Sequence, residues 1–387
     1  MIERHAYIGF SVFEGIGPLK FNRMLHVFGS ASASWNASEE QLKKAGLDMV
    51  GKKLVNFRQT FDPISYEKEI LEKEIKIVTR IDTGFPEPLK QIPDPPIVLF
   101  VKGDLNTRFP ELMVFNSGNL APTIGVVGTR KPTSYGKEVT QKLTRELVAY
   151  GFTIVSGMAR GVDGIAHRTA LELGGKTIAV LGCGVDIIYP PEHKDLYGNI
   201  LEKGNAIISE VPPGHTVLKG LFPARNRIIS GLSLGVIITE GAEDSGSLIT
   251  ARLATEQGKE VFAVPGPITS YLSVGPAKLI KQGAKIVTRV EDVLEELNVN
   301  PKSQILNPKP FDLAQGRQIQ NQNFKNLKLN GEAKIIVELL LKSGELHYDE
   351  IVRGSLLPSS EVGSILSLLE LDGIIRALGN GKYGLRS

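Results

Sequence analysis

Residues 123–182 read TIGVVGTRKPTSYGKEVTQKLTRELVAYGFTIVSGMARGVDGIAHRTALELGGKTIAVLG, and this stretch decides the fold. It holds three short apolar runs that end in glycine, at 123–128, 152–157 and 176–182. Such runs are typical of strands buried in a parallel sheet. The segments between them have apolar residues three and four apart, which predicts amphipathic helices. Strand, glycine and helix in alternation indicate an α/β fold with an extended Rossmann-like, doubly wound sheet.

The same alternation continues to about residue 295. Four more apolar runs are predicted to be strands: NAIISE at 205–210, LGVIITE at 234–240, KEVFAVPG at 259–266 and AKIVT at 284–288. In a doubly wound sheet, ligands bind outside the carboxyl ends of the strands. The loops that follow these strands are therefore where a functional site is expected.

The region that forms this sheet, 79–295, is flanked by segments of different composition. Residues 1–78 are predicted to form a helical domain, because their apolar residues recur at helical spacing. Five prolines then mark a connector that leads into a strand at 97–101. Residues 296–330 are rich in Asn, Gln, Pro and Lys, a composition that predicts a flexible linker.

The C-terminal segment, 331–387, is predicted to form a winged-helix domain, with three helices followed by a hairpin around an Asn-Gly pair. In a winged helix the third helix normally enters the major groove of a duplex. Here that helix, SSEVGSILSLLELDG, contains Glu361, Glu370 and Asp372 and has neither lysine nor arginine. We therefore expect this domain to dock on protein or to regulate the central domain, rather than to read duplex DNA.

The composition sets only broad limits. The chain has 387 residues and a net charge of +3, so a nucleic-acid partner has to be argued from local clusters of cations. Cys183 is the single cysteine, which excludes an internal disulfide and fits a reducing compartment. Since no apolar run approaches the ~20 residues of a membrane span, a cytoplasmic protein is expected.

The sequence lacks the usual motifs for cofactors and metals. Gly182 and Gly184 resemble the start of a dinucleotide fingerprint, but Ile187 stands where its third glycine belongs, and no GxxxxGK[ST] element is present. The six histidines show no metal-ligand spacing, and we interpret His167 and His193 as packed core residues. Neither a cofactor nor a metal is expected.

Cations and glycines follow the first two strands of the sheet. Arg130 and Lys131 come directly after the first strand, where they can hold a phosphate together with helix amides; pairing with a carboxylate at a helix end is the alternative. The second strand ends in Ser156 and Gly157, in a compact turn with Asp163 as the expected N-cap. Arg130, Lys131, Ser156 and Gly157 are all candidates for binding DNA.

The segment 209–233, SEVPPGHTVLKGLFPARNRIISGLS, is the most informative about function. Lysine and arginine bind phosphates while an aromatic ring stacks on a base, a combination that suits single-stranded DNA. The alternative places the phenylalanine in the core and the arginines at a solvated helix start. The candidate residues are Lys219, Phe222, Arg225, Asn226 and Arg227.

A third set of candidates follows the strand at 234–240. Ser245, Gly246 and Ser247 precede a helix whose free amides form a natural anion pocket. Glu240 is placed where a hydrolytic base could act. No second acid and no Ser/His/Asp set accompanies it at a known spacing, so no catalytic residue is predicted.

Several of these stretches, in this order, resemble the DprA/Smf family of DNA-processing proteins. The resemblance covers the central domain, about half of the chain. It implies a cytoplasmic homodimer that binds single-stranded DNA without catalysis and loads RecA recombinase on it during natural transformation. The matching stretches are VGTRKPTSYG, SGMARGVDGIAHRTAL, AVLGCGVDIIYPPEH, SEVPPG, FPARNRIISGLS, EGAEDSGSLITARLATEQGKEVFAVPG and LIKQGA.

The resemblance also implies residue roles and flanking domains. The family's DNA contacts fall on Arg130, Lys219 and Phe222, and the flanking regions are similar to a SAM-like domain of helix-hairpin-helix type and a winged helix. The chain departs from the family at residues 276–278, where Pro-Ala-Lys replaces the usual glycine and asparagine. Because dimer contacts of the family lie near this region, the dimer geometry is not predicted.

Two other functions stay open at this point. Lysine-decarboxylase-like phosphoribohydrolases use a related sheet, but their PGGxGTxxE motif is replaced here by EGAEDSGSLITA, which leaves Glu240 unsupported. A duplex-specific regulator would act through the winged helix, whose third helix is acidic. Nucleotide turnover would identify the first function, and preference for duplex DNA the second.

Overall fold

The structure is a computed structural model that describes residues 2–105, 122–218, 220–299, 331–372, 374–379 and 381–385. It divides into two compact units, Met1–Gln304 and Ile305–Ser387. The linker predicted at 296–330 falls, from residue 300 onward, outside the described residues. In the described part of the chain, no helix is both long and apolar enough to span a bilayer.

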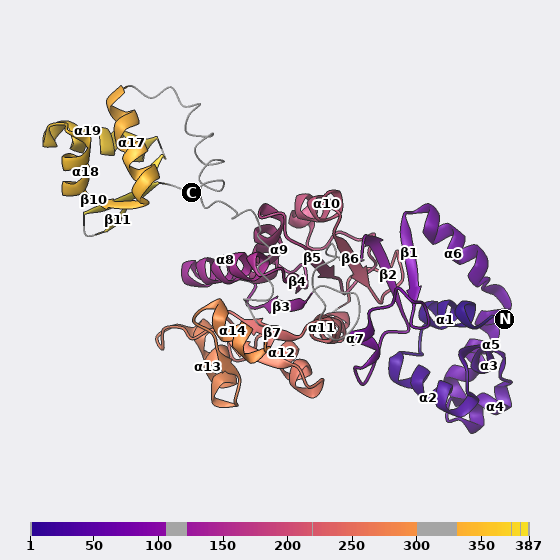
Figure 1. Cartoon of the computed structure of the whole chain (residues 1–387). Helices are drawn as coiled ribbons and strands as arrows, with labels where there is room; N and C mark the ends of the chain where they lie inside the picture. Colours follow the sequence, from indigo (N-terminus) through magenta and orange to yellow (C-terminus); the bar gives the residue numbers. More distant parts are fainter. Residues whose placement is uncertain are drawn as a thin grey trace. The chain divides into compact units, whose positions relative to one another are not determined.

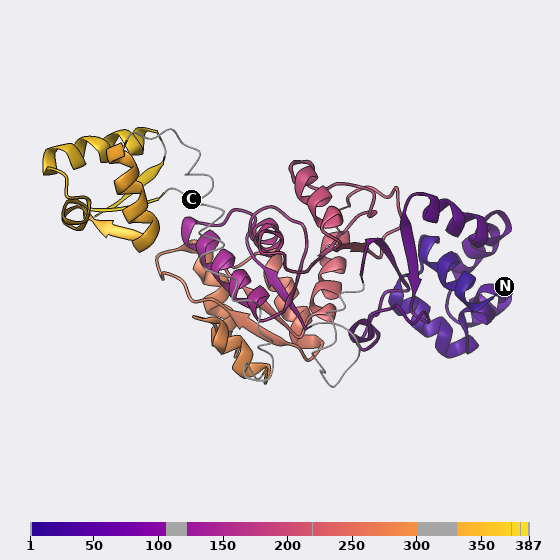
Figure 2. The same ribbon diagram turned by 45° about the horizontal axis from the view of Figure 1, so that its top comes forward.

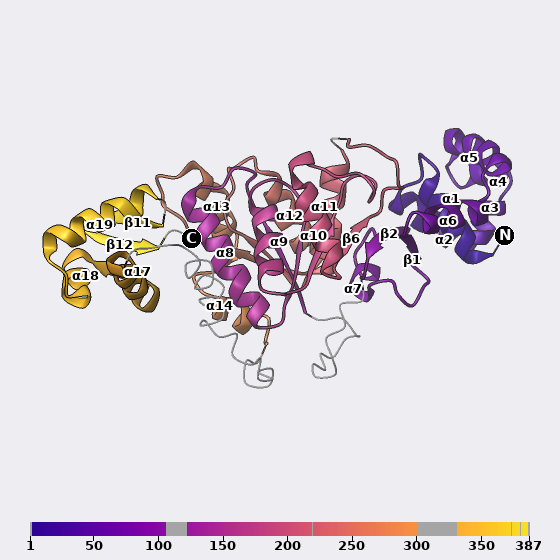
Figure 3. The same cartoon turned by 90° about the horizontal axis from the view of Figure 1, so that it is seen from above.

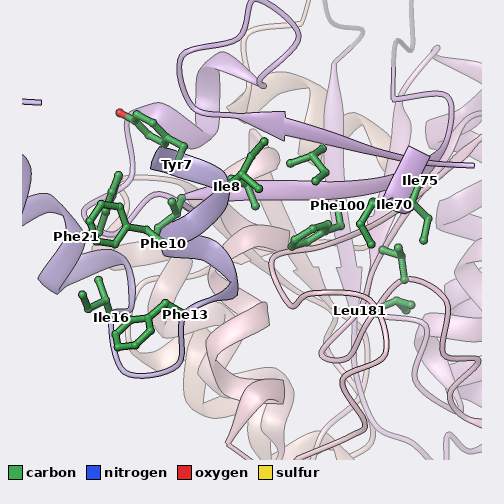
Figure 4. Close-up of a cluster of buried hydrophobic side chains, with 14 of the residues drawn as sticks. Tyr7, Ile8, Phe10, Phe13, Ile16, Phe21, Ile70, Ile75, Phe100 and Leu181 are labelled. Carbon is green, nitrogen blue, oxygen red and sulfur yellow. The ribbon is translucent and has the colours of Figure 1, made fainter. Parts of the chain in front are cut away.

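The first unit begins with a group of short helices around an aromatic core. Phe10 contacts Phe21 and Trp35, with ring centroids 5.2 and 5.1 Å away. The same buried cluster includes Phe100 and Leu181 from the sheet region (Figure 4), so the helices and the sheet share one core. The helices are α1 (Glu3–Val12), α2 (Pro18–Phe28), α3 (Ala31–Asn36), α4 (Glu39–Lys44), α5 (Asp48–Thr60) and α6 (Pro63–Glu72).

A nine-stranded sheet follows, in the order β1-β2-β6-β5-β4-β3-β7-β8-β9 (Figure 1). All pairs from β6 to β9 are parallel, which confirms the predicted Rossmann-like α/β fold. β1 and β2 extend one edge antiparallel, and β1 crosses the domain boundary expected at residue 78. The strands are β1 (Ile75–Thr79), β2 (Val98–Gly103), β3 (Thr123–Val127), β4 (Thr153–Ser156), β5 (Thr177–Val180), β6 (Ala206–Ser209), β7 (Gly235–Ile238), β8 (Glu260–Ala263) and β9 (Lys285–Ile286).

Helices cover both faces of this sheet because its central strands are apolar on both sides. Ile124 and Val126 of β3 pack in one cluster with α8, α9 and α14, whereas Val127 packs on the other side with α7, α11 and α12. Figure 2 shows helices on both sides of the sheet. Figure 3 shows α8, α9 and α10 side by side. The helices are α7 (Glu87–Lys90), α8 (Ser134–Ala149), α9 (Val162–Glu172), α10 (Lys194–Glu202), α11 (Leu221–Leu232), α12 (Gly246–Glu256), α13 (Val274–Lys281) and α14 (Val290–Glu296), with 3₁₀ turns η1 (Pro191–His193) and η2 (Tyr271–Ser273).

The strand order places a topological switch at β3. The chain runs from β3 to β4 on one side of β3, and β7 returns to its other side. At such a point the connecting loops diverge and leave a crevice at the carboxyl ends of the strands. The loops that contain Arg130 and Gly157 leave the sheet here.

The second unit has its own apolar core, formed by its three helices and a three-stranded antiparallel sheet. The three helices and the hairpin expected from the sequence are present, and a third strand, β10, joins the hairpin in the order β10-β12-β11. Assignment to the winged-helix class stays a prediction. The elements are α17 (Gly331–Ser343), β10 (Glu345–His347), α18 (Tyr348–Ser355), α19 (Ser359–Leu371), β11 (Ile375–Gly379) and β12 (Lys382–Leu385).

Candidate nucleic-acid interface

A small pocket opens at the carboxyl ends of β3, β4 and β5, where the strand order predicts a ligand. It combines two cations, one aromatic ring from a loop and one from a helix, and backbone from glycine-containing turns. Its walls are Arg130 after β3, residues 157–160 after β4, residues 181–183 after β5, Tyr189, Pro190, and Phe222 at the start of α11.

The ring of Phe222 lies next to two other residues of this pocket, Arg130 and Tyr189. The guanidinium carbon of Arg130 lies 5.6 Å from the centroid of the Phe222 ring, and the ring of Tyr189 lies 5.8 Å away at an angle of 42°. Phe222 is partly exposed and Arg130 is exposed, so the alternative that placed the phenylalanine in the core does not apply. A cation beside an accessible ring can hold a phosphate while the ring stacks on the neighbouring base.

Arg225 lies beneath the pocket and not on its surface. Its side chain donates to the carbonyl oxygens of Gly157 and Val180, and only 5% of the residue is exposed. A Cβ at position 157 would lie 2.6 Å from the Arg225 guanidinium, so glycine is needed there. The Arg225 side chain therefore holds the loop after β4 in place, and its predicted contact with a phosphate stays a prediction.

Asp163 completes this support from the other side of the loop. Its carboxylate accepts hydrogen bonds from the amides of Gly157 and Ala159, at 3.1 and 3.3 Å. Burial raises the pKa of Asp163, and the nearby Arg225 opposes that rise; burial also lowers the pKa of Arg225 to about 10. Since that value is far above neutral pH, the arginine stays charged beneath the loop.

Arg227 and Ser156 also have structural roles, and their assignment to DNA binding stays a prediction. Arg227 is 3% exposed, and its guanidinium bonds to Asp94 at 2.9 Å and Glu210 at 2.5 Å. The buried hydroxyl of Ser156 donates to the carbonyl of Val126 at 2.6 Å, which ties β4 to β3. The sequence offered no local sign of these partners.

The other candidates that the structure describes do not line the pocket. Asn226 donates to the carbonyl of Gly246 at 3.4 Å, a contact between α11 and α12. Ser245 caps α12, and its hydroxyl lies 2.8 Å from that of Ser247. Lys131 is exposed beside Arg130. Lys219 lies outside the described residues, and its assignment to DNA binding stays a prediction.

The side chains of Glu240, Cys183 and His167, which are the candidates for a catalytic role, are buried in the fold. Glu240 is 2% exposed and accepts from the amide and the hydroxyl of Thr133, at 2.8 and 2.6 Å, which fixes the start of α8. Burial raises the pKa of the Cys183 thiol to about 11. Burial lowers the pKa of His167 to about 3, and its Nδ1 pairs with the Thr177 hydroxyl at 2.6 Å, as expected of a core histidine.

The sequence analysis did not identify two residues of the pocket, Arg160 and Tyr189. Arg160 follows β4 between glycine-containing turns, the same signal that identified Arg130 after β3. Tyr189 lies in a proline-rich loop far from the phenylalanine it contacts, and no spacing connects the two. Among the residues that the structure describes, His, Cys, Asp and Glu form no group of three or more that could hold a metal ion.

Comparisons with known proteins agree with this geometry. A Bacillus subtilis DNA processing protein DprA is 45% identical over 240 residues, which are 62% of this chain and 76% of that protein. Protein Smf of Escherichia coli is 36% identical over 364 residues, which are 92% of this chain and 90% of that one. The X-ray structure of DprA from Streptococcus pneumoniae superposes with a TM-score of 0.62 at 35% identity, covering 75% of this chain and 95% of that one.

The family comparison covers the whole sheet. The model of the family described as DNA recombination-mediator protein A matches residues 76–298, from β1 to the end of α14. This range includes Arg130, Gly157, Arg225 and Phe222, and the resemblance to DprA/Smf proteins is confirmed. The chain belongs to the DNA recombination-mediator protein A family.

Proposed function

We propose that this protein binds single-stranded DNA in the pocket beside β3, β4 and β5 and delivers it to a RecA-type recombinase, without catalysis of its own. One observation carries the proposal: a partly exposed Phe222 ring with the Arg130 guanidinium 5.6 Å from its centroid, at the strand ends where this fold binds ligands. The names of the relatives, a DNA processing protein and a recombination mediator, support it.

The arrangement favours a single strand for a physical reason. Stacking a base on an aromatic ring contributes about 1–3 kcal/mol and depends little on the sequence, but it requires a base that is free of its partner. A duplex keeps its bases stacked and paired, so it offers Phe222 no accessible face. Arg130 and Lys131 then add phosphate contacts, whose strength falls as the salt concentration rises.

The lack of catalysis is part of the proposal. Its support is that Glu240 is enclosed by the start of α8, while the Cys183 thiol stays protonated and His167 stays neutral near pH 7. A nucleotide-processing enzyme would need one of these groups free. Turnover of nucleotides by the purified protein would revive the phosphoribohydrolase alternative.

The partners and the domain layout are proposed as well. We propose that the protein is a cytoplasmic homodimer that interacts with RecA in natural transformation, and its membership of a recombination-mediator family supports this. The second unit, as a winged-helix domain, would dock on protein: on α19, Leu368 and Leu371 are 60% and 83% exposed next to acidic residues. We keep residues 1–78 as the helical SAM-like domain, 79–295 as the DNA-binding domain and 296–330 as the linker.

The test is fluorescence anisotropy of labelled oligo-dT, titrated with the full chain at several salt concentrations beside the matching duplex. We expect tight, salt-sensitive binding of the single strand and weak binding of the duplex. Equal or tighter binding of the duplex would overturn the proposal and move the site away from Phe222. Absence of any binding would overturn it too.

A further inference from the structure

The loop after β4 is attached to the 3₁₀ turn η1 by two contacts of different character. Inside, Nδ1 of His193 lies 3.0 Å from the carbonyl oxygen of Met158, and both residues are buried. Outside, the guanidinium of Arg160 forms an ion pair with the carboxylate of Glu192. The side chains of this pair are 52% and 49% exposed, so solvent and solutes reach it.

Arg160 lines the same pocket as Arg130 and Phe222. The two cations differ in what faces them. Arg130 lies over the Phe222 ring, and in the described ranges no carboxylate pairs with it. Arg160 already has an anion within bonding distance, supplied by the protein itself. One of the two cations of the pocket is therefore occupied before a ligand arrives.

We propose that Glu192 occupies the place of a backbone phosphate, and that a bound strand displaces it and takes over Arg160. This inference rests on the proposed function and adds a residue to it. A guanidinium recognises carboxylate and phosphate with the same donors, so the two anions compete for one group. Exposed ion pairs are weak and open readily in water, whereas a strand held at Arg130 and Phe222 presents its next phosphate at high local concentration.

The buried contact explains why the exchange leaves the loop in place. Met158 has a φ of 59°, a left-handed conformation that is costly for a residue with a side chain. The contact with Nδ1 of His193 holds the carbonyl of Met158. Hydrogen bonds from Gly157 to Asp163 and from Arg225 to Gly157 hold the neighbouring backbone. Only the exposed side chains of Arg160 and Glu192 need to move, so the pocket keeps its shape while its charge becomes more positive.

The experiment compares four full-length proteins, namely wild type, Glu192→Gln, Arg160→Gln and the double variant, in anisotropy titrations of oligo-dT. We expect Glu192→Gln to bind roughly two- to five-fold more tightly, the range that follows from the strength of exposed ion pairs. Arg160→Gln should bind more weakly, with a salt slope lower by about 0.7 because one phosphate contact is lost. In the Arg160→Gln background, most of the gain from Glu192→Gln should disappear.

A matched control removes the same charge elsewhere on the unit. Glu296 pairs with Lys285 through side chains that are 30% and 51% exposed, between α14 and β9. Glu296→Gln changes the net charge as Glu192→Gln does, and it should leave the affinity for oligo-dT unchanged. An equal gain in both variants would mean that overall charge, and not competition for Arg160, sets the affinity, which would overturn the inference.

The outcomes separate this inference from the function on which it rests. If wild type binds the strand but Glu192→Gln binds no better, the inference fails and the proposed function stands. If Glu192→Gln gains equally with and without Arg160, the carboxylate acts by general repulsion and the inference fails again. If wild type binds no single strand, the proposed function fails, and the competition has no ligand to act on.

Discussion

The loops after β3–β5 lie where doubly wound sheets bind their ligands, and α19 is the helix that would enter a DNA groove in the winged-helix domain we propose. Their chemistry differs. The loops bring together Arg130, Arg160 and Phe222. The exposed side of α19 carries leucines, serines and carboxylates, with no lysine or arginine along the helix. Architecture alone would assign DNA binding to both surfaces, and the side chains assign it to one.

The contrast has a second part, in how each surface is supported. Beneath the pocket, Arg225 and Asp163 hold the loop after β4 through backbone hydrogen bonds. Beneath α19 lies a simple apolar core, formed by residues such as Val362 and Leu366. A buried ionic group is expensive unless each charge has its partners, so a loop built this way holds one conformation or loses much of its stability. We therefore expect the pocket to be preorganised.

The largest effect should come from removing that support. Arg225→Ala leaves the Asp163 carboxylate buried without its counter-charge, and we expect a loss of about 3–5 kcal/mol in the free energy of unfolding. Binding of oligo-dT should also weaken, because the carbonyl of Gly157 loses its donor. Urea unfolding and anisotropy measure the two effects. A free energy of unfolding within about 1 kcal/mol of wild type would show that Arg225 and Asp163 together contribute little to stability.

Arg227→Ala is the matched control for this change. It also removes a buried arginine from α11, but the carboxylates that pair with Arg227, Asp94 and Glu210, do not line the pocket. We expect a loss of stability together with an unchanged affinity of the folded protein for oligo-dT. Weaker binding by the folded Arg227→Ala protein would place Arg227 in the binding site.

The next effect is the loss of stacking. Phe222→Ala should weaken binding of oligo-dT roughly five- to 150-fold, the equivalent of about 1–3 kcal/mol per base, with the salt slope nearly unchanged. Titrations at four salt concentrations separate the two quantities. Phe222→Tyr keeps a ring of the same shape and should bind as wild type does. If Phe222→Ala lowered the salt slope but left the affinity for oligo-dT unchanged, Phe222 would position Arg130 and would not stack on a base.

How far the sequence predicted these features depends on the distance between partners. Strand and helix alternate within 60 residues, so the parallel sheet and the importance of its loops could be read directly. Arg130 was found because it follows a strand end, and Phe222 because cations surround it in the segment 209–233. β1 was missed because its five residues follow α6 at once and pair only at the sheet edge. Local patterns suffice where the determining contacts are local.

The structural roles that the sequence did not reveal at the site have the same cause. Arg225 and Arg227 look like a solvated, basic helix start until their partners are known, and those partners are distant: Gly157 is 68 positions from Arg225, and Asp94 is 133 from Arg227. Ser156 likewise bonds to a carbonyl 30 positions away. Whether a cation at a strand end faces solvent or supports the loop is decided by tertiary packing, which spacing does not encode.

A smaller effect is expected at Arg130. Arg130→Ala should weaken binding alike for oligo-dT and oligo-dC, and it should lower the salt slope by about 0.7–1 because one phosphate contact is lost. Arg252, an exposed arginine of α12 paired with Glu256, serves as control, and Arg252→Ala should leave the slope unchanged. A loss that depended strongly on the base would mean that Arg130 reads base edges, contrary to its position over the ring.

The smallest effect should follow removal of the entire second unit. A chain ending at Gln304 keeps every described residue of the pocket, and it should bind oligo-dT within about twofold of the full chain, the tolerance for independent parts. The segment from Ile305 to Ser387 has its own core, so it can be purified and tested alone. It should leave a duplex unbound at physiological salt, because Glu361 and the other carboxylates of α19 repel phosphates. Binding of the duplex by this segment, or a tenfold loss on its removal, would place a second DNA surface on α19 and end the contrast between the two regions.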